Sequence, residues 1–187
     1  MVIIGSGLVV LLLSSVVTAQ SMMVIGSGSL AHQCYRASTS AALTGSAHQS
    51  DVENCDKALD YALLRKRDLI ATYVNRGVVH AAMENLSAAV KDYNKALKMD
   101  PNVAEAYINR GNVWFVASNY PQAIKDYSRS LELGIAQEHV ALLNRGMVYE
   151  ATGRYTLAKQ DYLAALDRVA EWPTALSKLE RVNKKIK

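Results

Sequence analysis

The triplet Asn109-Arg110-Gly111 stands near the middle of the chain and sets the frame for its other residues. The same three residues recur at Asn75-Arg76-Gly77 and at Asn144-Arg145-Gly146, so the glycines lie 34 and then 35 residues apart. A period in this range is typical of stacked supersecondary units, each of which needs its neighbours to bury its apolar face. The sequence therefore predicts a repeat architecture instead of one closed core.

Four further positions recur in register around each glycine. In the order large apolar, small, aromatic and small, they are Tyr73, Ala89, Tyr93 and Ala96, then Tyr107, Ala123, Tyr127 and Ser130, then Leu142, Ala158, Tyr162 and Ala165. Apolar residues three and four apart predict two amphipathic helices in each unit. The glycine and alanine positions are where two helices must approach closely, and the aromatic side chains fill the space beside them.

This pattern resembles the tetratricopeptide repeat over about residues 68–173, with units at 70–101, 104–135 and 139–173. The resemblance implies an all-α fold, a right-handed superhelix of stacked antiparallel helix pairs. Two features depart from the family pattern. An arginine replaces the usual leucine before each glycine, and the closing proline is in place only at Pro101, with Pro173 arriving late in the third unit.

The two ends of the array are expected to be capped. Residues 52–66 match a second helix that has lost its first, and this half-repeat would cover the exposed edge of the first unit. Residues 174–187 carry an apolar stripe and a net charge of +4, which equals the charge of the whole chain, and they predict a C-terminal capping helix. The repeat domain would then span residues 51–187.

The first 35 residues contain no Asp, Glu, Lys or Arg. Residues 1–19 are typical of a secretory signal peptide, with an apolar core and a cleavage position after Ala19. This predicts export to the periplasm or the outside, and the alternative is an uncleaved membrane anchor. Residues 20–50 are rich in Ser, Gly and Ala and predict a flexible linker with little stable structure except near Cys34.

The chain has two cysteines, Cys34 and Cys55. In an exported protein they predict a disulfide that ties the linker to the half-repeat, whereas in a reducing compartment they would stay as free thiols. Together with His32 and His48 they could also be considered as metal ligands, but the spacing fits no recognised zinc pattern. We therefore expect a disulfide and no metal.

The resemblance places the first helix of each unit along a concave groove. The residues that it brings to this groove, and that we expect to contact a partner, are Asn75, Glu105, Ile108, Asn109, Asn112, Phe115, Leu143, Asn144 and Met147. Val74 and Val78 join the apolar members of this set, which would offer pockets for apolar side chains.

Asn75, Asn109 and Asn144 recur at one groove position and form a ladder of amides. An amide both donates and accepts, so such a ladder can hold the backbone of a peptide without reading its sequence. The alternative is that these asparagines bond neighbouring helices and shape the superhelix. Some relatives grip a C-terminal carboxylate with basic residues, but the corresponding positions here hold Val74, Glu105 and Asn109, so that clamp is not expected.

The arginine before each glycine recurs with an aspartate 16 residues later: Arg76 with Asp92, Arg110 with Asp126, and Arg145 with Asp161. The recurrence predicts an ion pair between the two helices of each unit, with a structural role.

No nucleophile elbow, phosphate loop or zinc-protease motif occurs, so catalysis and a cofactor are not expected. The predicted function is a protein-interaction scaffold that binds a peptide or partner protein in the groove. No nucleic-acid partner is expected, because no aromatic and basic stripe accompanies the tail. The alternative is a structural protein of the cell envelope that keeps its apolar N-terminus as an anchor and lays its basic tail on lipid. A membrane contact is expected only in that case, and no oligomeric state is predicted.

Overall fold

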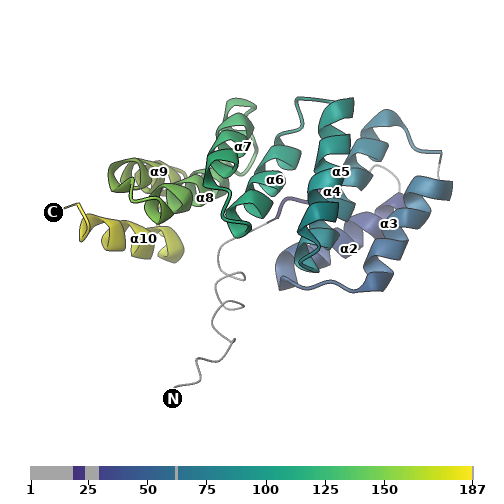
Figure 1. Cartoon of the computed structure of the whole chain (residues 1–187), viewed down its shortest axis with the longest axis horizontal. Coiled ribbons are helices and arrows are strands. Elements are labelled where there is room, and N and C mark those ends of the chain that lie inside the picture. The colour runs from purple at the N-terminus through teal and green to yellow at the C-terminus, as the bar shows by residue number, and fades with distance from the viewer. Residues whose placement is uncertain (1–18, 24–29, 62, 187) are drawn as a thin grey trace, which may run out of the picture.

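The computed structural model describes residues 19–23, 30–61 and 63–186. In this part of the chain the secondary structure is entirely helical. The nine helices are α2 (Leu30–Thr44), α3 (Gln49–Tyr61), α4 (Lys66–Ala82), α5 (Leu86–Met99), α6 (Ala104–Val116), α7 (Tyr120–Glu132), α8 (Glu138–Ala151), α9 (Tyr155–Arg168) and α10 (Pro173–Asn183). They stack in chain order into one elongated row (Figure 1). The predicted all-α solenoid of helix pairs is confirmed.

The three repeats that carry an Asn-Arg-Gly triplet are called the signature repeats below. In each of them the two helices pack together where a glycine of the first helix contacts a tyrosine of the second. A Cβ added at Gly111 would lie 2.8 Å from the Tyr127 ring, and one added at Gly77 would lie 2.5 Å from the Tyr93 ring. These tyrosine side chains are at most 1% exposed. The glycine is therefore required by close approach and not by a turn, since a side chain in its place would push the aromatic ring out of the core.

The predicted arginine–aspartate pairs are present in all three repeats. Arg110 donates from Nε and Nη2 to the two carboxylate oxygens of Asp126 at 2.7 and 2.8 Å. The other two pairs have the same bidentate geometry: Arg76 with Asp92 and Arg145 with Asp161. The aspartates are buried and the arginines are about one-fifth exposed, so each pair is partly shielded from water.

A third bond of each arginine reaches the preceding helix pair. The Nη1 atoms of Arg76, Arg110 and Arg145 donate to Asp56 on α3, Asn94 on α5 and Ser128 on α7. One guanidinium therefore joins three helices, two of its own repeat and one of the repeat before it. Five fixed donors suit arginine to this role better than lysine.

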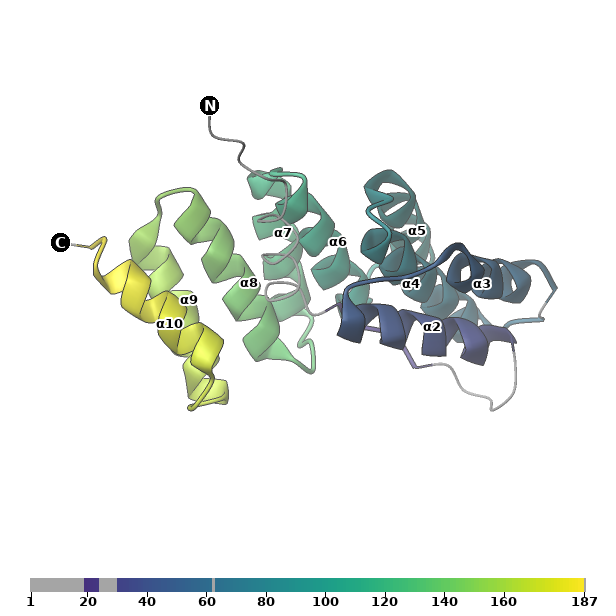
Figure 2. The same cartoon turned by 90° about the horizontal axis from the view of Figure 1, so that it is seen from below.

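Two N-terminal predictions are wrong. Residues 30–44 form helix α2 instead of a flexible linker, and α3 has not lost its first helix because α2 takes that place. Figure 2 shows α2 running alongside α3 and α4. The buried face of α2 consists of small residues at helical spacing: Ala31, Cys34, Ala37, Ser38 and Ala41. Such residues give a weak hydrophobic pattern, and the high content of Ser, Gly and Ala in this segment led to the prediction of a linker.

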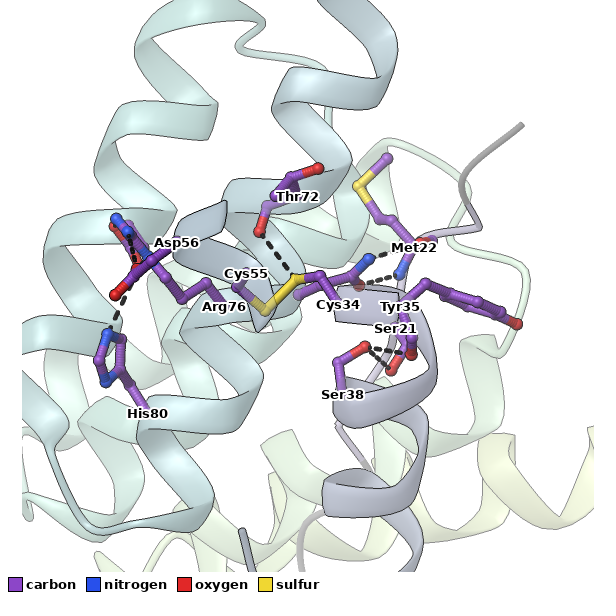
Figure 3. Close-up of a disulfide and its surroundings, with 12 residues drawn as sticks. Ser21, Met22, Cys34, Tyr35, Ser38, Cys55, Asp56, Thr72, Arg76 and His80 are labelled. Atoms are coloured by element: carbon purple, nitrogen blue, oxygen red, sulfur yellow. Dashed lines mark hydrogen bonds and ion pairs between the residues drawn. A yellow bond between two sulfur atoms is a disulfide. The ribbon is translucent and has the colours of Figure 1, made fainter. Parts of the chain in front are cut away.

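The disulfide Cys34–Cys55 joins α2 to α3, with the Cα atoms 4.5 Å apart (Figure 3). Both cysteines are fully buried and pack against Val52, Val78 and Val79. A covalent bond therefore joins the two helices of the N-terminal pair, which packs next to the first signature repeat.

Helix α10 covers the last repeat, as predicted for the capping helix. Ala175 and Val182 are fully buried and pack with Leu143 and Tyr162. Arg181 also binds Glu150 of α8, which accepts from the Tyr162 hydroxyl as well. The C-terminal end of the array is thus closed by packing and by an ion pair.

None of the described helices is both long and apolar enough to cross a membrane. Residues 1–18 of the predicted signal peptide lie outside the described residues, so its cleavage and the membrane-anchor alternative stay predictions.

Candidate peptide-binding groove

The amide ladder predicted from the triplets is present on three successive first helices. Asn75, Asn109 and Asn144 lie on α4, α6 and α8, and each is at most 2% exposed. They align because the repeats are stacked with a nearly constant period of 34 or 35 residues.

Two of these amides hold the backbone of residues 20–22 of the same chain. The N–H of Met22 donates to Asn75 Oδ1 at 2.8 Å, and Asn75 Nδ2 donates to the Met22 carbonyl at 2.9 Å. Gln20 makes the same pair of bonds with Asn109, both at 2.8 Å. Each asparagine therefore uses its donor and its acceptor on one residue, as a neighbouring strand would.

The spacing of the bonded residues identifies the conformation that the groove accepts. Gln20 and Met22 are two apart, which is the period at which an extended chain presents its backbone groups to the same side. The segment runs from Asn109 of the second repeat toward Asn75 of the first as the residue number rises. The first two repeats thus bind this extended segment with one amide pair each.

The third asparagine is used differently. Asn144 Nδ2 donates to Asn112 Oδ1 at 3.0 Å, and the Tyr127 hydroxyl donates to the same oxygen at 2.8 Å. Asn144 Oδ1 and Asn112 Nδ2 are buried without a hydrogen-bond partner in the part of the chain that the structure describes. Asn75 and Asn109 therefore bond a segment of the same chain, whereas Asn144 bonds a neighbouring helix, and the holding of a partner peptide stays a prediction.

Side chains of the segment fix its position further. Ser21 and Ser38 share a hydrogen bond of 3.0 Å between their hydroxyl groups (Figure 3). Gln20 Nε2 donates to Gln137 Oε1 at 2.7 Å. Met22 packs on the buried cluster that contains Ile70. The segment thus contacts α2, α4, α6 and the start of α8.

An open pocket of about 330 Å³ adjoins the Met22 side chain. Lys66, Arg67 and Ile70 of α4 line it together with Asp100 and Val103 from the turn before α6. Basic, acidic and apolar groups thus meet at the end of the segment that lies over the first repeat.

The apolar residues expected in the groove lie deeper than the resemblance implies. Ile108, Leu143 and Met147 are at most 6% exposed, and Val74 and Val78 are at most 1% exposed. Ile108 packs with Tyr127 in the second repeat, so it supports the groove from inside instead of forming an open pocket wall. A contact of these residues with a partner stays a prediction.

Phe115 and Glu105 remain partly accessible. The Phe115 ring packs against Tyr120, with the ring centres 6.1 Å apart. Asn112 is 4% exposed and is committed to Tyr127 and Asn144, so it acts within the stack. No basic residue occupies the three positions of the carboxylate clamp, which hold Val74, Glu105 and Asn109.

The titrating groups next to the first and last repeats are perturbed by burial and by their partners. Burial lowers the pKa of His80, although Asp92 opposes this shift. Burial raises the pKa of Glu150, but the hydrogen bonds from Arg181 and Tyr162 outweigh it and leave this pKa below its ordinary value.

Burial also raises the pKa of the core tyrosines Tyr93 and Tyr127, which stay neutral at physiological pH. These shifts follow from packing and are not evidence of a catalytic centre.

Residues of the described ranges do not form a cluster of three or more His, Cys, Asp or Glu side chains that could hold a metal.

Sequence reasoning missed the peptide side of the site: Gln20, Ser21 and Met22, with Ser38 and Gln137 as their contacts. The predicted row of asparagines indicates that a peptide backbone is bound, but it does not identify the segment of chain to which that backbone belongs. Ser38 could have been found from the buried stripe of α2, whereas no spacing rule points to Gln20 or Met22.

The fold and the groove together define a helical-repeat solenoid whose first helices line an amide-bearing concave face. The tetratricopeptide repeat profiles match residues 70–103, 104–133 and 139–168, which is about half of the chain. The chain therefore belongs to the tetratricopeptide repeat family. The comparison with curated proteins found no match.

Solved structures share this fold at low sequence identity. The MamA protein is 16% identical with a TM-score of 0.65, and the alignment covers 83% of this chain and 82% of that one. The first repeat domain of Spaghetti (RPAP3), bound to the HSP90 peptide SRMEEVD, is 20% identical with a TM-score of 0.60, covering 63% and 92%. The second such domain of human RPAP3, in complex with the HSP70 peptide SGPTIEEVD, is 22% identical with a TM-score of 0.56, covering 59% and 92%.

Proposed function

We propose that this protein is an interaction scaffold that binds an extended segment of a partner protein in its concave groove, without catalysing a reaction. The observation that carries the proposal is the paired bonding of Asn75 and Asn109 to the backbone of Met22 and Gln20. A groove that satisfies both backbone groups of alternate residues is built for an extended chain, because a helix has already used these groups internally.

The solved domains of similar fold that contain HSP90 and HSP70 peptides support a peptide as the ligand class. The ligand of this chain would differ in charge. Val74, Glu105 and Asn109 stand where basic clamp residues would be needed, and both amide pairs are uncharged. We therefore expect an uncharged internal segment to bind better than an acidic C-terminus.

The test is binding to an array of synthetic peptides, measured with the full chain and with the double variant Asn75→Asp, Asn109→Asp. The carboxylate keeps the shape of the amide but loses the N–H donor, so each pair loses one bond and gains a repulsion with the peptide carbonyl. We expect the double variant to lose most of the binding to the array. Its melting temperature should fall, because two buried amides lose their bonds to Met22 and Gln20, whereas its circular dichroism should show the native helix content.

Asn94→Asp is the matched control, because Asn94 lies outside the groove and accepts a bond from Arg110 that a carboxylate can also accept. This variant should keep the array pattern. Equal binding by the native chain and by the groove double variant would overturn the proposal.

We also propose that the protein is exported. The Cys34–Cys55 disulfide supports this, because structural disulfides persist in oxidising compartments. The test is the intact mass of the protein from its native host, measured without reductant. A chain that begins at Gln20 and is two hydrogens lighter than the dithiol form is expected, and a full-length chain with two free thiols would overturn the proposal.

A further inference from the structure

We propose that residues 20–23 are a resident ligand of the groove, which a partner segment must displace and must resemble. The inference rests on the proposed function and adds two statements to it. The groove of the free protein is occupied by its own chain, and the partner is an extended, uncharged segment with a small residue between the two amide-paired residues.

The contacts of the segment meet the requirements of a bound ligand. Four backbone bonds of 2.8–2.9 Å link Gln20 and Met22 to the two asparagines. Asn75 and Asn109 are buried side chains, at most 1% exposed, and the segment satisfies both their donors and their acceptors. Without an occupant, each asparagine would exchange these bonds for bonds to water.

The side chains of the segment indicate which partner residues fit. Ser21 lies against Ser38, which is fully buried on α2, so the residue between the two pairs must be small. Met22 packs beside Ile70, where a long unbranched apolar side chain can follow an irregular surface. Met23 is 66% exposed, so the residue after the second pair is unrestricted.

The covalent link makes the resident segment a strong competitor even if its intrinsic affinity is weak. Only six residues separate Met23 from the start of α2 at Leu30. A short link of this kind holds a ligand at an effective concentration on the order of millimolar. A partner peptide therefore binds with an apparent affinity that is reduced by the fraction of chains whose groove is already filled.

The experiment compares two single substitutions that replace methionine by proline at adjacent positions. Met22→Pro removes the N–H that donates to Asn75, whereas Met23→Pro leaves the N–H groups of Gln20 and Met22 in place. Neither substitution changes a residue of α4, α6 or α8, but Met22→Pro also removes the methionine side chain that packs beside Ile70. The probe is a fluorescent peptide with the sequence of residues 20–23, blocked at both ends to remove its terminal charges. Its binding to each full-length chain is measured by fluorescence anisotropy.

We expect the Met22→Pro chain to bind the probe at least about tenfold more tightly than the native chain, and the Met23→Pro chain to behave like the native one. Equal, measurable binding by all three chains would overturn the resident ligand and leave the proposed function intact. No binding by any chain would overturn both. Equal gains in the two proline variants would show a general effect of proline, and would overturn the role of the Met22 N–H.

Light scattering on the native and Met22→Pro chains distinguishes binding within one chain from binding between copies. We expect both chains to have the same mass in solution. A native dimer that becomes a monomer on Met22→Pro would place the segment in the groove of a second copy and would overturn the intramolecular contact.

Discussion

Helices α4 and α5 close on each other through Gly77 and Tyr93, whereas helices α2 and α3 close through small residues and a disulfide. The signature repeats add a buried arginine–aspartate pair that also binds the preceding helix pair. Among the described helices none precedes the N-terminal pair, and within the described residues its part of this network is the Asp56 carboxylate that accepts from Arg76. The three repeats are thus joined to their neighbours by packing and by charged hydrogen bonds, whereas the N-terminal pair has a covalent link between its own two helices.

The largest effect is expected where the repeats differ most from the N-terminal pair, at the contact of Gly111 with Tyr127. Tyr127→Ala removes a fully buried ring and its hydroxyl bond to Asn112, and should cost about 3–5 kcal/mol of unfolding free energy. Gly111→Ala should also destabilise the native chain, by about 1–3 kcal/mol, because its Cβ would overlap the ring. Urea denaturation followed by circular dichroism measures both.

The combination of these two changes gives the sharper test. With alanine at position 127 the ring is absent, so Gly111→Ala should become neutral or stabilising by up to about 1 kcal/mol, the helix preference of alanine over glycine. Gly111→Ala should thus change sign between the two backgrounds. The same cost in both would contradict close packing as the reason for the glycine.

Reduction of the disulfide should have the next largest effect and should act at the other end of the molecule. The bond closes a sequence separation of 21 residues, for which chain entropy predicts about 3 kcal/mol. We expect reductant to increase hydrogen exchange in α2 and α3 and to leave α6 and α7 nearly unchanged, because repeats contact only their neighbours.

The double variant Cys34→Ala, Cys55→Ala is the control for this measurement. Its exchange should resemble that of the reduced native chain and should not respond to reductant. Exchange that rises evenly over all helices would contradict a local role of the disulfide.

The pair Arg110–Asp126 should show a smaller effect than the core ring. Arg110→Ala leaves a carboxylate that is 2% exposed with the Trp114 N–H as its remaining side-chain donor, and should cost about 2 kcal/mol. In a double-mutant cycle with Asp126→Ala we expect a coupling of about 1–3 kcal/mol. The exposed pair Arg129–Glu132 is the matched control, and its coupling is expected to be close to zero. Additive effects of Arg110→Ala and Asp126→Ala would contradict the pairing.

The repeats could be predicted from the sequence because their signal is periodic and chemically specific. The Gly, Tyr and Arg–Asp positions recur three times, and each recurrence has a direct packing reason that the structure confirms. Helix α2 was missed because Ala31, Ser38 and Ala41 are small residues, whose burial produces little contrast between faces. The occupant of the groove was missed for another reason: an amide pair recognises backbone, so the bound segment carries no sequence mark of its own.

The smallest effect is expected at the C-terminal cap, where Glu150 accepts bonds from Arg181 and Tyr162. Because these bonds hold the pKa of Glu150 below its ordinary value, their stabilisation is present at neutral pH and is lost as the pH falls through the folded-state pKa. Glu150→Gln should therefore cost about 1 kcal/mol near pH 7, and the difference from the native chain should shrink below about pH 4.5. Urea denaturation at a series of pH values measures the difference, with Glu132→Gln in an exposed pair as the control that should stay near zero throughout. The absence of any difference at any pH would contradict a contribution of the ion pair and would mean that α10 is held by the packing of Ala175 and Val182.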